Sequence, residues 1–353
     1  MKKAVSVLMA FAMTAALLSG CAKSRPEITQ ATSAPEKETT AEAVKETQET
    51  QSTGNAYPLK IGSLKGPTSM GLVRLMDQSE KGGAKGSYTF TMVTAADELL
   101  GKIVSKELDV ALVPANMASI IYNKTNQGVS VIDINTLGVL YVLSSDDSIK
   151  TAADLKGKTV YLTGKGTTPD YVLQHVLKAS GLTTDDVTLE YKSEPAEVAS
   201  ILKEKPDAAG LLPQPFVTAA MAQNDSLKMV LDLTKEWDAT AGENGGSLVT
   251  GVTICRNDIL KDHKDAIDTF MAEHKESAEF SNSNVAETAA LVAAAGIIEK
   301  APVAEKALPY CSITYVDGDQ MKSLLGGYLK VLFDMEPTSV GGTLPDDNFY
   351  YMQ

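Results

Sequence analysis

The sequence of 353 residues has only three cysteines and no CxxC spacing, so it shows no pattern of a structural metal site. The catalytic patterns GxSxG and HExxH are also absent. Ser200 and Lys203 match the SxxK pattern, but the SDN and KTG motifs that accompany it in enzymes are missing, and an exposed helical face explains the match. The sequence therefore predicts no metal, no cofactor and no enzymatic activity.

Nucleotide-binding patterns are incomplete as well. The loop GKGTT, residues 164–168, stands between a strand-like segment and a helical one, as phosphate-binding loops do. A P-loop would need Gly where Thr159 stands and Ser or Thr where Gly166 stands, and the GxGxxG pattern fails at Pro169. The net charge of −13 also argues against nucleic acid as a partner. Two interpretations of the loop are left: a capped turn, or a helix N-terminus that receives an anion or a polar ligand atom.

The N-terminus has the three parts of a secretory signal peptide: the basic start MKK, the apolar run 4–17 and small residues before Cys21. The apolar run is shorter than the about 20 residues that a membrane span needs. The segment LSGC, residues 18–21, resembles the lipobox of bacterial lipoproteins, which implies that Cys21 becomes an acylated N-terminus. Since two or more acyl chains anchor a protein stably, we expect a lipid-anchored protein on the extracytoplasmic face of the cell membrane. The alternative is an ordinary cleaved signal peptide, which would release a soluble protein.

Residues 22–56 are rich in Thr, Glu, Ala, Gln and Lys and nearly lack large apolar side chains. Such a segment buries too little surface to offset its ordering entropy, so we expect a disordered tether. The body that begins at about Tyr57 has roughly 300 residues, enough for one large domain or two lobes. Its two cysteines, Cys255 and Cys311, could pair outside the cytoplasm or stay as buried thiols.

The body alternates strand-like and helical segments, which favours an α/β fold with mostly parallel sheets. Four strand–helix junctions look alike, each with a short apolar strand, a cluster of turn or polar residues, and an amphipathic helix: LKIGSL-KGPTSM, DVALV-PANMAS, KTVYLT-GKGTTPDY and DAAGLL-PQPFVTAA. Ligands of open α/β sheets bind beyond the carboxyl ends of the strands, where the N-termini of helices point. The four junctions, two before and two after a central crossover, therefore predict two lobes that face one cleft.

The motif DLKGKTV at residues 154–160, followed by TGKGTTPDY, resembles the entry to the second lobe of ABC-transporter substrate-binding proteins. The group that it resembles is the nitrate, sulfonate and taurine type, which includes carriers of thiamine pyrimidine precursors. The segments ELDVALVPANMASIIYNK, PDAAGLLPQPFVTAAM and LVTGVTICRNDIL resemble further strand–helix units of this group, and the resemblance covers residues 57–353. A related enzyme on this fold uses a cysteine-rich motif that has no match here.

The resemblance implies a two-lobed type II periplasmic-binding-protein fold with a ligand cleft between the lobes. Lobe 1 would comprise residues 57–146 and 249–353, and lobe 2 residues 147–248, with hinges near residues 145–149 and 246–249. We expect a monomer that captures a small molecule by lobe closure and delivers it to an ABC permease and its ATPase. The alternative is a surface lipoprotein without a transport role, such as a sensor partner or an adhesin.

The candidate ligand-binding residues come from the four junctions and from the end of the strand before the crossover: Lys65, Gly66, Thr68, Ser69, Asn116, Met117, Thr136, Gly166, Thr167, Thr168, Gln214 and Phe216. Lys65 and Lys165 favour an anion such as a sulfonate, but no arginine, the usual residue for bidentate oxyanion capture, occurs in the junctions. A neutral, pyrimidine-like heteroaromatic ligand is the alternative. Trp237 could stack on such a ligand or pack internally. His263 and His274 lie among charged residues and are expected at the surface.

Overall fold

The computed structural model describes residues 57–205, 207–240 and 246–352. The predicted signal peptide with Cys21 (1–21), the predicted tether (22–56) and Gly245, next to the second predicted hinge, lie outside these described residues. No helix within the described ranges is both long and apolar enough to span a membrane.

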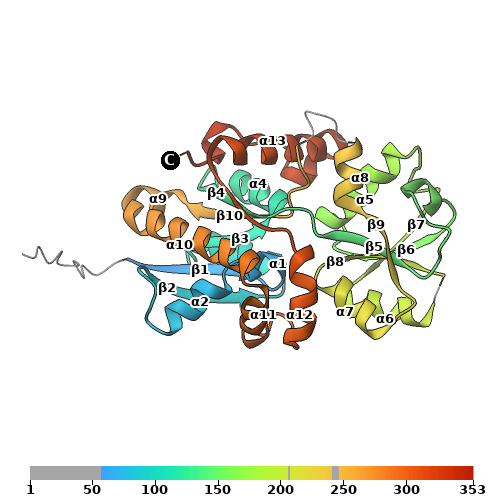
Figure 1. Cartoon of the computed structure of the whole chain (residues 1–353). Helices are drawn as coiled ribbons and strands as arrows, with labels where there is room; N and C mark the ends of the chain where they lie inside the picture. The colour runs from blue at the N-terminus through green and yellow to red at the C-terminus, as the bar shows by residue number, and fades with distance from the viewer. Residues whose placement is uncertain (1–56, 206, 241–245, 353) are drawn as a thin grey trace, which may run out of the picture. The chain divides into compact units, whose positions relative to one another are not determined.

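Two separate sheets organise the unit Thr53–Gln353, and each carries its own helices (Figure 1). The strands of the first sheet are, in spatial order, β11 (Ile313–Val316), β4 (Val129–Thr136), β10 (Gly251–Arg256), β3 (Val110–Pro114), β1 (Pro58–Leu64) and β2 (Ser87–Val93). Those of the second sheet are β7 (Thr188–Lys192), β6 (Thr159–Thr163), β8 (Ala209–Pro213), β5 (Leu140–Ser144) and β9 (Lys228–Asp232). We call the first sheet with its helices lobe 1 and the second lobe 2. The predicted α/β fold is confirmed.

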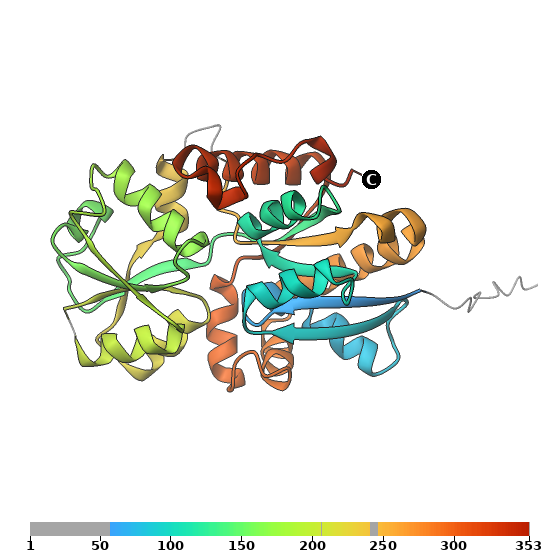
Figure 2. The same ribbon diagram turned by 180° about the vertical axis from the view of Figure 1, so that it is seen from behind.

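The helices lie on both faces of each sheet. Those of lobe 1 are α1 (Pro67–Met70), α2 (Val73–Glu80), α3 (Ala96–Val104), α4 (Ala115–Lys124), α9 (Asn257–Asp262), α10 (Lys264–Ser283), α11 (Val285–Ala294), α12 (Ala301–Ala307) and α13 (Gly318–Met335), with the short turns η2 (Leu308–Tyr310), η3 (Pro337–Val340) and η4 (Asp347–Phe349). Those of lobe 2 are η1 (Ala152–Leu155), α5 (Thr168–Ala179), α6 (Pro195–Glu204), α7 (Phe216–Gln223) and α8 (Leu233–Thr240). In lobe 2, α5 and α8 cover one face of the sheet and α6 and α7 the other (Figures 1 and 2).

Strand direction determines where the junctions lie. In the first sheet β1 is parallel to β2 and β3, with Ile61 opposite Val110 in the register. In the second sheet β6 is parallel to β7 and β8, with Val160 opposite both Leu189 and Ala209. The apolar run of β3 is buried on both faces, as is typical of an inner parallel strand. As a result, the carboxyl ends of β1 and β3 share one edge of lobe 1, and those of β6 and β8 share one edge of lobe 2.

The chain crosses between the sheets twice. Strand β5 pairs with β8, with Leu140 opposite Pro213, so it already belongs to the second sheet. The first crossover therefore runs through residues 137–139, between the end of β4 and the start of β5. It lies earlier than the predicted hinge near 145–149, because the apolar segment before that hinge is already a strand of lobe 2. The second crossover, residues 246–250, includes the segment predicted as the second hinge. The backbone N–H of Thr250 donates to the carbonyl of Thr136 at 3.0 Å, which ties the second crossover to the end of β4, directly before the first crossover.

Gly246 begins the second crossover directly against α13. Its φ of 61° lies in the left-handed region that favours glycine. A Cβ atom at this position would lie 2.4 Å from the carbonyl oxygen of Leu324 and 3.0 Å from the backbone nitrogen of Tyr328. Because both are backbone atoms of a helix and cannot move aside easily, the crossover can rest on α13 only with glycine at this position.

The two cysteines of the described residues are free and buried. Cys255 lies in β10, and the thiol of Cys311 donates to the carbonyl of Ala307 at 3.2 Å. Burial raises the pKa of Cys311 to about 12 and raises the pKa of Cys255 well above its ordinary value. Both side chains are therefore packed, unreactive thiols in this structure, rather than the partners of a disulfide.

Candidate functional site

Two of the four predicted junctions meet across the boundary between the lobes. Asn116 lies in the first turn of α4, after β3 of lobe 1, and Thr168 is the first residue of α5, after β6 of lobe 2. The Thr168 hydroxyl donates to the side-chain oxygen of Asn116 at 3.4 Å, and both residues are buried. Helix N-termini from both lobes therefore converge at the strand ends, where the sequence predicts the cleft.

The C-terminal part of the chain completes this contact. Tyr328 of α13 donates from its hydroxyl to Thr168 Oγ1 at 3.2 Å, and Asn116 Nδ2 donates to the carbonyl of Ser339 at 3.1 Å. Burial raises the pKa of Tyr328, so its hydroxyl keeps the proton that it donates. Neither Tyr328 nor Ser339 was among the predicted site residues, because only tertiary packing places α13 and η3 beside these junctions.

At the first junction, the predicted hydroxyls bond to their own lobe. Thr68 Oγ1 donates to the carbonyl of Leu64 at 2.9 Å. Ser69 Oγ makes two contacts at 2.7 Å, one to the same carbonyl and one to Ser63 Oγ. These bonds tie the short helix α1 to the end of β1, while Lys65 is exposed. The first junction is therefore an ordered turn with its one cation at the surface.

No threonine side chain of the GKGTT loop caps α5. Thr167 is the N-cap residue, but its hydroxyl donates to the carbonyl of Gly164 at 2.6 Å and makes no cap to the helix. The carboxylate of Asp170, in the first turn of the helix, instead holds the loop, because its Oδ2 accepts the backbone N–H of Gly166 at 2.8 Å. An acidic residue at this position resembles the reciprocal half of a capping box.

Gln214 stands at the fourth junction, beside the first crossover. Its backbone N–H donates to the carbonyl of Val139 at 2.9 Å. Its side-chain oxygen accepts both the backbone N–H and the hydroxyl of Thr218, at 3.3 and 2.9 Å, which fixes the orientation of the amide. The side chain is fully buried, and its Nε2 has no hydrogen-bond partner among the described residues. Buried polar groups in proteins are nearly always paired, so this donor needs an explanation, and a ligand atom that accepts its proton is one.

The twelve predicted site residues differ in how exposed they are to solvent. Gly66, Thr68, Ser69, Asn116, Thr136, Thr168 and Gln214 are buried, Met117, Thr167 and Phe216 are half-buried, and Lys65 and Gly166 are exposed. Thr136 donates to Asn135 Oδ1 at 2.9 Å at the start of the first crossover. Among the predicted residues, Asn116 and Thr168 are joined directly by a hydrogen bond across the lobe boundary.

Trp237 packs internally in this structure. It is fully buried on α8, with ring centroids 4.6 Å from His175 of α5 and 5.4 Å from Tyr328 of α13. Its Nε1 donates to the carbonyl of Gly246 at 3.4 Å. Trp237 could have stacked on a ligand or packed internally, and these contacts match internal packing. The side chain holds the second crossover and α13 against lobe 2.

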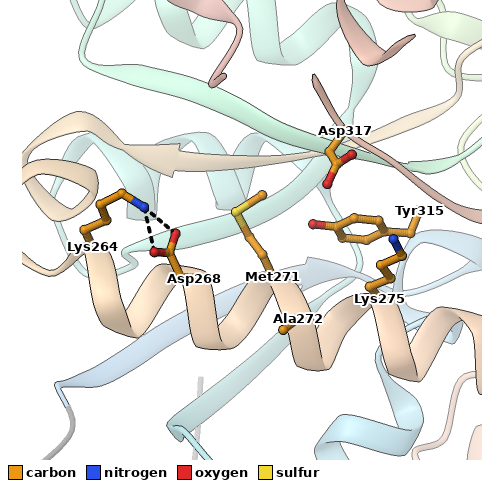
Figure 3. A pocket seen from close by; sticks show the side chains of 7 residues that line it. All are labelled: Lys264, Asp268, Met271, Ala272, Lys275, Tyr315 and Asp317. Carbon is orange, nitrogen blue, oxygen red and sulfur yellow. Dashed lines mark hydrogen bonds and ion pairs between the residues drawn. The ribbon is translucent and has the colours of Figure 1, made fainter. Parts of the chain in front are cut away.

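Two hollows lie away from the junctions. One of about 440 Å³ lies over α10 and β11 of lobe 1, where Lys264 pairs with Asp268 and Lys275 lies beside the ring of Tyr315 (Figure 3). Another of about 420 Å³ is lined by His175 of α5 and Asp334 of α13. Because neither contains a predicted junction residue, they do not form part of the candidate site.

His274 is not at the surface, as the sequence suggested, but fully buried in lobe 1. Its Nδ1 lies 3.2 Å from Asp133 Oδ2, and the other oxygen of Asp133 accepts the hydroxyl of Thr253 at 2.8 Å. Asn135 in turn donates to Thr253 Oγ1 at 3.1 Å, and it also accepts from Thr136. A buried polar chain therefore runs from α10 through the sheet to the start of the first crossover.

Two sheets whose junctions meet between them, joined by two crossovers, define a periplasmic-binding-protein fold. Residues 124–287 match the family model described as NMT1/THI5 like. Similar solved structures include an ABC transporter protein from Parabacteroides distasonis, with 22% identity, a TM-score of 0.71, and coverage of 84% of this chain and 99% of that one. The periplasmic aliphatic sulphonate binding protein SsuA from Escherichia coli has 18% identity, a TM-score of 0.67, and coverage of 84% and 92%.

A conserved Candida albicans gene product with the generic periplasmic binding protein fold is also similar, with 16% identity, a TM-score of 0.57, and coverage of 83% of this chain and 92% of that one. Among curated proteins, none matches this sequence. The predicted resemblance to ABC-transporter binding proteins and the predicted two-lobed fold are thereby confirmed.

Proposed function

We propose that this chain is an extracytoplasmic solute-binding lipoprotein, which captures a small molecule between its lobes and delivers it to an ABC importer. The residues of the four junctions would contact the solute, and acyl chains on Cys21 would hold the protein to the cell membrane. An ABC permease with its ATPase would receive the solute. The protein would act as a monomer, without a cofactor and without catalysis.

The contact between Thr168 and Asn116 carries this proposal, because it joins helix N-termini of both lobes where open α/β sheets bind ligands. A solute that touches both lobes stabilises only the closed arrangement, and it shifts the equilibrium by that difference in free energy. A change from mostly open to mostly closed needs about 5 kcal/mol, which a few well-placed hydrogen bonds can supply.

Two solute classes are open to such a protein. The similar SsuA protein is named for aliphatic sulphonates, which supports a sulfonate-like anion. A pyrimidine-like heteroaromatic is the second class, because the junctions offer hydroxyl and amide groups but no arginine.

A thermal-shift screen of the full-length protein in detergent tests the proposal. The panel contains taurine, methanesulfonate, nitrate, pyrimidines and vitamins, and a bound solute should raise the melting temperature by mass action. Exchanging Thr168→Ala together with Gln214→Ala should weaken that binding by more than about tenfold, since buried hydrogen bonds are lost on the side of lobe 2. The exchange Asn282→Ala, on α10 of lobe 1, serves as the control and should leave binding unchanged. A protein that no member of the panel stabilises would contradict the proposal.

The lipid anchor gives a separate prediction. Exchanging Cys21→Ser removes the thiol that would carry an acyl chain, so we expect the protein to leave the membrane fraction almost completely. The measurement is fractionation of cells followed by immunoblotting, with Cys311→Ser as the matched control. A Cys21→Ser protein that stays on the membrane would show that another element anchors it.

A further inference from the structure

We infer that the solute is uncharged and presents a hydrogen-bond acceptor, and that Asp170 is the residue that excludes anions from the site. This inference rests on the proposed function and narrows its two solute classes to one chemistry. Two independent observations carry it: the protein's own carboxylate at the N-terminus of α5, and the unpartnered amide of Gln214.

Asp170 already supplies a carboxylate at the N-terminus of α5, where an external anion would bind. This side chain is 3% exposed, and its Oδ2 accepts the backbone N–H of Gly166 at 2.8 Å. Its Oδ1 accepts Gln174 Nε2 at 2.6 Å and the hydroxyl of Tyr191 at 2.7 Å. Three donors from the loop, the helix and β7 therefore hold one fixed negative charge behind the GKGTT loop.

Three further N–H groups of the same turn are engaged as well. The backbone N–H of Thr167 donates to the carbonyl of Gly164 at 2.9 Å, and those of Asp170 and Tyr171 donate to the carbonyl of Thr167 at 3.1 Å. Pro169 has no N–H to give. An anion bound at this helix N-terminus would find few donors and would face the carboxylate of Asp170, whose repulsion is strong in a buried setting.

Among the residues that the structure describes, no buried cation compensates for this carboxylate at the junctions. Lys65 and Lys165 are exposed, and Lys165 Nζ lies 5.2 Å from the centre of the Tyr191 ring. Within the described residues, the buried arginine is Arg256 at the far end of β10, where Asp109 and Asp258 already pair with it. A desolvated anion would thus lack the partner that buried charges need.

Gln214 supports the second part of the inference, that the solute presents a hydrogen-bond acceptor. Its amide is oriented by Thr218, so Nε2 is the group left to interact, and Nε2 is buried without a partner. The backbone bond to Val139 places Gln214 beside the first crossover, which joins the two lobes. An amide N–H₂ donates only, so the atom that it receives must be an acceptor such as a carbonyl oxygen or a ring nitrogen.

Binding of two probe sets to the full-length protein in detergent tests the inference. The uncharged probes are uracil, cytosine and nicotinamide, and the anions are methanesulfonate, ethanesulfonate and nitrate. We expect the wild-type protein to bind an uncharged probe and to bind the anions at least about tenfold more weakly. Asp170→Asn should strengthen anion binding by about tenfold or more, because it removes the repelling charge and keeps the side-chain shape.

The control is Asp154→Asn, which exchanges another aspartate of lobe 2 that accepts backbone N–H groups, and it should change neither binding constant. Gln214→Glu should weaken the uncharged probe by about tenfold to a hundredfold, because it turns the donor into an acceptor. Wild-type protein that binds sulfonates more tightly than every uncharged probe would overturn the inference and leave the proposed function standing. If neither probe set binds, the inference fails together with the proposed function.

Discussion

Replacing Asp133 with alanine should lower the free energy of unfolding by about 3–5 kcal/mol, the loss typical of breaking a buried ion or hydrogen-bonded pair. Asp133 is fully buried, and its two oxygens bond to the hydroxyl of Thr253 at 2.8 Å and to Nδ1 of His274 at 3.2 Å. Without the carboxylate, both donors stay in the core of lobe 1 with no partner, and each bears its desolvation penalty. Urea denaturation at constant pH, followed by circular dichroism, measures this loss.

A matched exchange at the surface distinguishes the loss of the buried pair of Asp133 and His274 from a general effect of removing an aspartate. Asp268 lies on the same helix as His274, and it pairs with Lys264 at 2.6 Å with its side chain 40% exposed. Asp268→Ala should therefore change the free energy of unfolding by less than about 1 kcal/mol. Equal losses for Asp133→Ala and Asp268→Ala would show that the buried pair does not stabilise lobe 1.

Local patterns predicted the fold and the junctions because they depend on short segments. An apolar strand, a turn residue and an amphipathic helix follow one another along the chain, and parallel strands then bring the junctions to one edge of each sheet. The first crossover was misplaced because Asp146 and its neighbours look like a hinge, whereas the apolar run of β5 before them already pairs with β8. Strand pairing, and not turn composition, decides where the chain changes lobes.

The polar partners inside the site could not be read from local patterns. His274 was assigned to the surface because Lys275 and Glu276 follow it, yet it stands on the apolar stripe of α10 with Ile267 and Phe270. That spacing of three to four residues was the one signal that could have placed it in the core. Tyr328 gave no such signal, because it reaches Thr168 only after α13 has packed against the boundary between the lobes.

Exchanging Trp237→Ala should lower the free energy of unfolding by about 3–5 kcal/mol, through lost burial and through the cavity left behind. The ring contacts His175 and Tyr328, so the cavity would open between lobe 2 and α13 of lobe 1. The bond to the carbonyl of Gly246 is lost at the same time, which frees the second crossover from its support. Chemical denaturation followed by circular dichroism measures the loss, because the variant has no tryptophan left to report by fluorescence.

The conservative exchange Trp237→Phe should recover part of this loss, because it refills most of the volume but cannot donate to Gly246. Tyr310→Ala is the matched control, since Tyr310 is 46% exposed and its removal should change the free energy of unfolding by about 0.5 kcal/mol or less. Wild-type fluorescence gives an independent check: a fully buried tryptophan should emit at short wavelength and shift to the red on unfolding. Emission typical of exposed tryptophan in the folded protein, or a Trp237→Ala loss no larger than that of the control, would contradict the packing of Trp237 between the lobes.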